Sequence, residues 1–126
     1  MAVETRITEA AYQRLSLEEP VRKWELRNGQ LEEKPGMTWE HGSLNMRLGY
    51  LLLRQLDWTE YDVLSETRVQ GRPGSIFIPD VIVAPVAVGE NFRNMPGSLA
   101  IIHESLPLVI EVWSVSTGKC DIAAKV

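Results

Sequence analysis

Residues 77–83 read FIPDVIV and residues 108–113 read LVIEVW, and each run is apolar apart from one acidic residue. Short runs rich in Ile and Val are typical of buried strands in an α/β sheet. Asp80 interrupts the first run and Glu111 interrupts the second. Because an isolated buried carboxylate is strongly unfavourable, each of these two must be paired with a cation, bound to a metal or shifted in pKa.

These two carboxylates predict a functional site at the point where their strands lie side by side. Adjacent strands would bring Asp80 and Glu111 together, and their like charges would repel each other unless a cation bridged them. Carboxylate oxygens are hard ligands that suit Mg²⁺ or Mn²⁺. Without metal, we therefore expect Asp80→Asn or Glu111→Gln to relieve the repulsion and raise stability.

The pattern along the rest of the chain predicts an α/β fold, with a mixed sheet of about four to five strands and helices on its faces. Thr8 and Thr38 are suited to cap two helices, and Asn28-Gly29 is suited to a two-residue hairpin turn. The expected helices cover residues 8–19, 38–58 and those from 119 onward. The expected strands cover residues 23–27, 30–34, 62–70, 75–84 and 108–113, and residues 86–106 are expected to form a long loop with at most one helical turn.

The composition fits one globular domain spanning residues 1–126, with a helix and hairpin in 1–36 and a core in 37–126. With 44% hydrophobic and 24% charged residues, a collagen-like chain, a wholly disordered chain and a coiled coil are excluded. The net charge of −4 does not favour a protein that wraps DNA non-specifically. It is compatible with a nuclease, because divalent ions neutralise catalytic carboxylates.

Several other chemistries find no support in the sequence. Cys120 is the only cysteine, which excludes an internal disulfide, and His41 and His103 are the only histidines, which excludes a His-rich metal site. No Gly-rich phosphate loop and no Gly-x-Ser-x-Gly segment occurs. The N-terminus lacks an apolar leader and no run is long enough to span a bilayer, so we expect a cytoplasmic protein with no membrane partner.

An ordered set of motifs resembles a known family. Pro79-Asp80 followed at a distance by Glu111-Val112-Trp113 resembles the core of a PD-(D/E)XK nuclease. More narrowly, the chain resembles the Uma-two family of bacterial restriction-endonuclease-like proteins over residues 20–126. The segments that carry this resemblance are Trp24-Glu25-Leu26, Asn28-Gly29, Glu40-His41, residues 78–81, residues 109–114, Asp121 and Lys125.

The resemblance implies a restriction-endonuclease-like core that hydrolyses phosphodiester bonds in DNA with Mg²⁺ or Mn²⁺. The metal would lower the pKa of a bound water and stabilise charge on the phosphate. The residues implied in this chemistry are Asp80, Glu111 and the Val112 backbone carbonyl as metal ligands, Lys125 as the cation that orients water, and Glu40 and His41 as accessory residues.

This sequence departs from the superfamily pattern at two places. The lysine expected two residues after the glutamate is replaced by Trp113, and Lys125 fits the role better than Lys119 because it lies nearer the face expected to be buried. The family pattern also continues beyond Val126. A non-catalytic nuclease-fold module or a remnant is therefore the alternative function. An exposed sheet edge would then favour self-association, which makes a homo-oligomer an expected form.

Each site residue also has an ordinary structural explanation. Asp80 could lie at an exposed bulge, and Lys125 could form a surface pair with Asp121 four residues before it. Glu40 and His41 could be solvated polar residues at a helix start, where a negative charge is favourable whatever its role.

Overall fold

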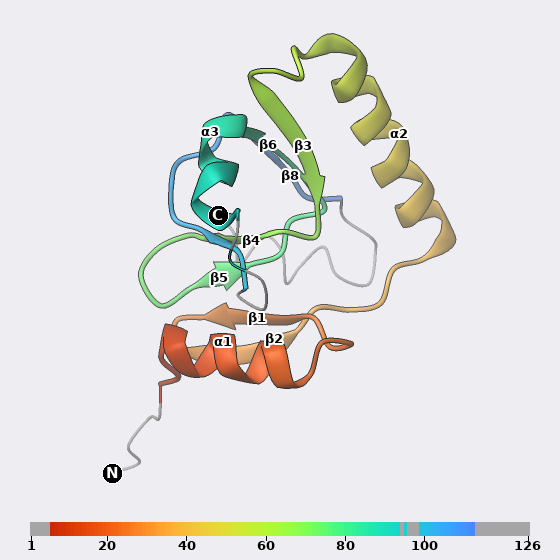
Figure 1. The fold of residues 1–126 in the computed structure, drawn as a ribbon. Helices are drawn as coiled ribbons and strands as arrows, with labels where there is room; N and C mark the ends of the chain where they lie inside the picture. Colours follow the sequence, from red (N-terminus) through yellow and green to blue (C-terminus); the bar gives the residue numbers. More distant parts are fainter. Residues whose placement is uncertain (1–5, 94, 96–98, 113–126) are drawn as a thin grey trace.

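The computed structural model describes residues 6–93, 95 and 99–112, and it has the α/β architecture expected from the sequence (Figure 1). The helical elements are α1 (Glu9–Glu18), α2 (Trp39–Gln55), α3 (Val86–Gly89) and the 3-10 helix η1 (Glu90–Phe92). The strands are β1 (Trp24–Arg27), β2 (Gln30–Glu33), β3 (Tyr61–Ser65), β4 (Arg68–Gln70), β5 (Ile76–Phe77), β6 (Val81–Pro85), β7 (Ile101–Ile102) and β8 (Leu108–Ile110).

The strands form two sheets, of five and of three strands, rather than one sheet of four or five. The order is β2-β1-β5-β4-β7 in the larger sheet and β3-β6-β8 in the smaller. Strands β4 and β7 are parallel and the other pairs are antiparallel, so the larger sheet is mixed as expected.

Two expected strands are each broken into two, and this is why the sheet count differs. Residues 62–70 form β3 and β4 with a break at Glu66, whose φ of 52° lies in the left-handed region. Residues 75–84 form β5 and β6, with a break at Pro79-Asp80, where proline has no N–H to donate to a ladder. At each break the chain passes from one sheet to the other, and the second break places Asp80 where the two sheets meet.

The N-terminal prediction is confirmed. Thr8 Oγ1 accepts a hydrogen bond from Ala11 N–H at 3.1 Å and caps α1. The turn at Asn28-Gly29 has φ of 49° and 80°, and it joins β1 to β2 as a hairpin. Because β1 also pairs with β5, the hairpin is part of the five-stranded sheet.

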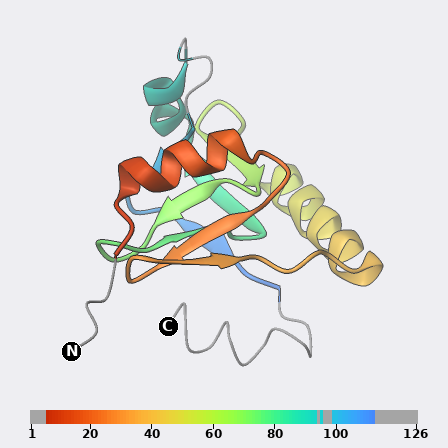
Figure 2. The ribbon, with the colours of Figure 1, turned by 90° about the horizontal axis from the view of Figure 1, so that it is seen from below.

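Besides the buried residues 81–84 of β6, a cluster of buried apolar residues lies between α1 and the five-stranded sheet (Figure 2). It is formed by Tyr12 from α1 together with Leu26, Ile76 and Ile101 from three different strands. The hydroxyl of Tyr12 donates to the Trp24 carbonyl oxygen and accepts from Arg68 Nε, so the polar atom of this buried side chain is paired.

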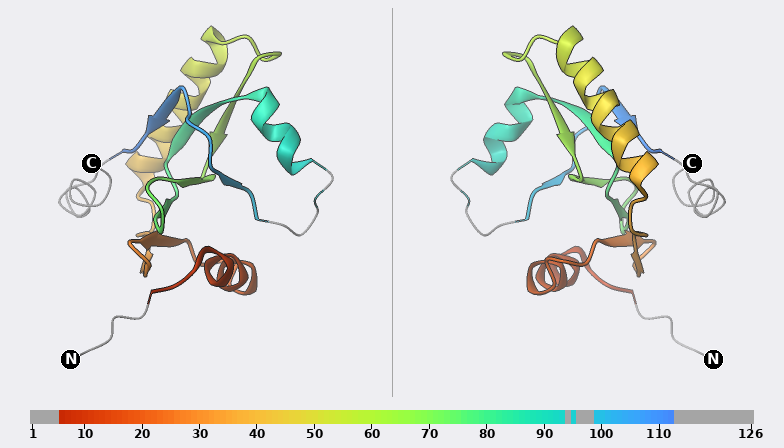
Figure 3. Two further views of the ribbon diagram at one scale, coloured as in Figure 1. Left: turned by 90° about the vertical axis from the view of Figure 1, so that its left-hand side faces the viewer. Right: turned by 90° about the vertical axis from the view of Figure 1, so that its right-hand side faces the viewer.

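Helix α2 begins where the sequence predicts and ends three residues earlier than expected. Thr38 Oγ1 accepts from His41 N–H at 3.2 Å and caps the helix, which ends at Gln55 rather than near Trp58. The helix lies along the three-stranded sheet, against β3 and β6 (Figure 3). It has no fully buried residue, and its Met46, Tyr50 and Leu53 side chains line a groove described below.

The segment expected as a long loop contains more structure than its sequence predicts. Residues 86–92 form α3 and η1, and Ile101–Ile102 adds the parallel strand β7 at the edge of the larger sheet. In the part of the chain that the structure describes, no helix is long and apolar enough to cross a membrane.

Candidate functional site

The site forms at the start of β6, where this strand meets the end of β8. Strand β6 pairs antiparallel with β8, with Val81 opposite Ile110, as expected for neighbouring strands. The Asp80 N–H donates to the Ile110 carbonyl oxygen at 3.1 Å. This pairing brings Asp80 next to Glu111, the residue that follows Ile110 in the chain.

Asp80 is the buried centre of the site, with 2% of its surface exposed. Its Oδ2 accepts a hydrogen bond from the Val112 N–H at 2.6 Å. Its Oδ1 is 3.2 Å from Lys34 Nζ, 3.3 Å from Asn45 Nδ2 and 2.9 Å from His41 Nε2. Asp80 is therefore neither at an exposed bulge nor isolated, because both of its carboxylate oxygens have partners.

The surroundings keep Asp80 ionised. Burial alone raises the pKa of this carboxyl group. The Val112 N–H, the Lys34 ammonium and His41 together outweigh burial, so the pKa of Asp80 lies below its usual value. These favourable partners argue against the expectation that Asp80→Asn stabilises the metal-free protein, and that expectation stays a prediction to be measured.

Lys34 is the cation that joins the two acidic residues. Its Nζ lies 3.6 Å from Glu111 Oε1 as well as 3.2 Å from Asp80 Oδ1, and it also donates to the Ile78 carbonyl oxygen. The side chains of Lys34 and Glu111 are 12% and 15% exposed. Within the described residues the cation between the two carboxylates is therefore the Lys34 ammonium group, and the expected divalent ion stays a prediction.

Helix α2 supplies a second wall of the site. His41 and Asn45 lie four residues apart, so one face of the helix presents both side chains to Asp80. His41, predicted as an accessory residue, is therefore part of the site. Glu40, the other predicted accessory residue, is exposed in the first turn of α2. Among the described residues, no hydrogen bond or ion pair joins it to Asp80 or Glu111.

Three residues that sequence reasoning did not select also shape the site. Lys34 and Asn45 contact Asp80 directly, and the Glu25 carboxylate accepts from the Ile78 N–H at 2.7 Å, which fixes the chain just before Pro79. The spacing of His41 and Asn45 could have indicated Asn45. Lys34 gave no signal, because a lysine at the end of a charged hairpin strand is ordinarily solvated.

The remaining predicted positions are partly outside the described residues. The Val112 N–H is seen on Asp80, while the role of its carbonyl as a ligand stays a prediction. Lys125, Lys119 and Trp113 lie outside the described part of the chain, so the choice between the two lysines stays a prediction.

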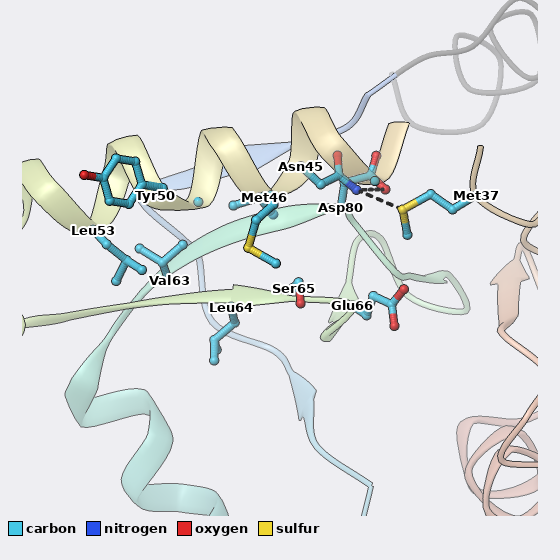
Figure 4. Close-up of a pocket in the computed structure, with 13 residues that line it drawn as sticks. Met37, Asn45, Met46, Tyr50, Leu53, Val63, Leu64, Ser65, Glu66 and Asp80 are labelled. Carbon is cyan, nitrogen blue, oxygen red and sulfur yellow. Dashed lines mark hydrogen bonds between the residues drawn. The ribbon is translucent and has the colours of Figure 1, made fainter. Parts of the chain in front are cut away.

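A groove leads away from the site between α2 and β3 (Figure 4). It encloses about 440 Å³, and Asp80 and Asn45 lie at one end. Its walls are mostly apolar, formed by Met46, Tyr50 and Leu53 of α2 and by Val63 and Leu64 of β3. The groove places an apolar surface directly beside the buried carboxylate.

The donor chemistry of the site suits Mg²⁺ or Mn²⁺. No group of three or more His, Cys, Asp or Glu side chains is arranged to hold a metal within the described residues. Magnesium, however, is commonly bound by one or two carboxylates, with waters and substrate phosphates as its other ligands. Asp80 and Glu111 already surround one cation, and the buried Asn45 Oδ1 accepts no hydrogen bond from the described residues. These oxygens fit a divalent ion.

The fold has a counterpart among solved structures. It is similar to a crystal structure described as "a putative nuclease belonging to DUF820" from Anabaena variabilis, with a TM-score of 0.63 and 17% sequence identity. The similarity covers 79% of this chain and 55% of that chain, so this chain spans little more than half the length of its structural neighbour.

The sequence comparison is more specific. Residues 10–126 match the family model "Uma2: Putative restriction endonuclease". The chain therefore belongs to the Uma2 family, as its motifs indicated. No curated protein matches the chain.

Proposed function

We propose that this protein is a metal-dependent endonuclease that hydrolyses phosphodiester bonds in DNA. The observation that carries the proposal is the convergence of Asp80 and Glu111 on one cation where β6 meets β8, in a chain of the Uma2 family. The cytoplasmic location expected from the sequence is part of the same proposal.

The proposed roles follow the chemistry of each side chain. Asp80 and Glu111 would hold Mg²⁺ or Mn²⁺, with the Val112 carbonyl as a further ligand. Such an ion supplies water activation and neutralises negative charge on the phosphate. Lys125 would orient the attacking water or stabilise developing charge. Of the two accessory residues, His41 is the better supported, because it contacts Asp80.

The residues of the chain prepare this site before any ligand arrives. The Val112 N–H holds one oxygen of Asp80 at 2.6 Å, and His41 and Asn45 hold the other from α2. A carboxylate that is already ionised and fixed in orientation needs no proton release and little rearrangement to accept a cation. The pKa of Asp80, which is lower than usual, supports this role.

The test is cleavage of supercoiled plasmid DNA with Mg²⁺ or Mn²⁺, with a single-stranded RNA assayed in parallel. We expect Asp80→Asn and Glu111→Gln each to abolish cleavage, and Lys125→Ala to reduce the rate about tenfold or more. Asp62→Asn is the matched control, since Asp62 is exposed on β3 and should leave the rate unchanged.

Circular dichroism must show that each variant is folded at the assay temperature. Full activity of folded Asp80→Asn or Glu111→Gln would contradict the metal assignment. A wild-type protein that binds Mn²⁺ but cleaves no nucleic acid would favour the alternative, a non-catalytic nuclease-fold module. Cleavage of RNA alone would correct the substrate.

A further inference from the structure

The Lys34 side chain is enclosed by oxygen atoms in the way a bound metal ion is. Its Nζ faces one oxygen each of Ile78, Asp80 and Glu111, and the side chain is 12% exposed. Two carboxylates and a backbone carbonyl are also the ligand types that Mg²⁺ and Mn²⁺ prefer. The ammonium group therefore lies among the oxygens that the proposed function assigns to the metal.

The backbone of the hairpin holds Lys34 at this place. The Lys34 N–H donates to the Lys23 carbonyl oxygen at 2.8 Å, directly beyond the paired residues of β1 and β2. Because the register of the hairpin fixes Lys34, its side chain reaches the carboxylates from the end of β2 in the five-stranded sheet, whereas Asp80 directly precedes β6 of the other sheet. Four rotatable bonds in the stem allow the ammonium to move away while the backbone stays in place.

We propose that Lys34 is an internal counter-ion that keeps Asp80 and Glu111 together without metal and that a divalent ion must displace. This inference rests on the proposed function for the existence of the metal site. A compact ammonium group and a divalent ion cannot occupy the space between the same oxygens, and their like charges repel each other. Lys34 therefore sets the metal concentration at which the site fills.

This role differs from that of a purely structural lysine in a measurable way. A structural lysine stabilises the site, so its removal would loosen the carboxylates and weaken metal binding. A competing counter-ion also stabilises the metal-free protein, but its removal frees the ligand oxygens and tightens metal binding. The two roles predict the same change in metal-free stability and opposite changes in metal affinity.

The experiment measures Mn²⁺ binding by isothermal titration calorimetry for the wild type, Lys34→Met and Lys34→Gln, together with melting temperatures in EDTA and in Mn²⁺. We expect both variants to bind Mn²⁺ about tenfold more tightly or better, the size of effect common for neighbours of metal ligands. We also expect both to melt lower than the wild type in EDTA and to gain more stability from Mn²⁺.

Lys23→Met is the matched control, because Lys23 pairs with the exposed Glu66 and should leave Mn²⁺ affinity unchanged. Lys34→Gln serves where Lys34→Met fails to fold in EDTA, since its amide can still donate to the Ile78 carbonyl. Unchanged or weaker Mn²⁺ binding in the folded Lys34 variants, with binding intact in the wild type, overturns this inference alone. Absence of Mn²⁺ binding in every protein, wild type included, overturns the proposed metal site as well.

Discussion

Replacing Asp80 by asparagine separates the two explanations for a carboxylate in an apolar strand. The substitution keeps the shape of the side chain and removes its charge and one acceptor. In the structure both oxygens face donors, with Val112 N–H on Oδ2 and Lys34 and Asn45 on Oδ1. A new NH₂ group in the Oδ2 position would face the Val112 N–H, and one in the Oδ1 position would face the donors of Lys34 and Asn45.

The cost follows from these contacts. The variant loses a charge-assisted hydrogen bond and leaves the Lys34 ammonium, itself nearly buried, with one carboxylate in place of two. Breaking a buried ion pair and its hydrogen bonds costs about 3 kcal/mol. For a domain of this size the melting temperature should fall by roughly 10 °C.

The pH dependence gives the sign of the effect. Because the pKa of Asp80 is lowered in the folded protein, its stabilising contribution is complete above the usual carboxyl range, about pH 4. It is lost as the pH falls through the lowered folded value. The difference in stability between wild type and Asp80→Asn should therefore be largest near neutral pH and shrink in acid.

The assay is urea unfolding in EDTA at several pH values, with Asp62→Asn as an exposed control. The control should match the wild type near neutral pH. An Asp80→Asn variant that is as stable as the wild type, or more stable, at neutral pH without metal would refute this reasoning. It would restore the simpler idea that Asp80 and Glu111 mainly repel each other.

Two further predictions concern the local structure around the site. Thr38→Ala removes the hydroxyl oxygen that caps α2 by accepting from the His41 N–H. The free energy of unfolding measured in urea should fall by about 1 kcal/mol, whereas Thr38→Ser should keep the wild-type value. Gly29→Ala should destabilise by about 1 kcal/mol or more, because φ is 80° and the new Cβ would lie 2.8 Å from Arg6 Cβ. A Gly29→Ala variant with wild-type stability would show that the hairpin turn relaxes without cost.

The sequence predicted correctly those turns and helix starts that depend only on neighbouring residues. The Asn28-Gly29 turn and the caps at Thr8 and Thr38 depend on a few neighbouring residues, and all three are confirmed. The break at Glu66 was missed because an alternating pattern continues through it, and the break at Pro79 was missed because apolar residues lie on both sides of Pro79-Asp80. A strand that bends from one sheet into another keeps its apolar residues on both sides of the bend, so hydrophobic periodicity alone does not locate the break.

The same distinction applies to the site residues: some can be recognised within a short segment of sequence, and others only through contacts between distant segments. Asp80 and Glu111 could be selected from sequence, because an acidic residue within an apolar strand violates the burial pattern in a short window. Lys34 could not be selected, since its role depends on the end of the hairpin meeting the start of β6, across 46 residues of chain. The sequence therefore predicted a divalent ion between the carboxylates and did not identify the ammonium group that the chain itself places there. Because that ammonium already neutralises the carboxylates, the geometry around Asp80 forms without a metal, and under the proposal made for Lys34 metal binding would be an exchange of one cation for another.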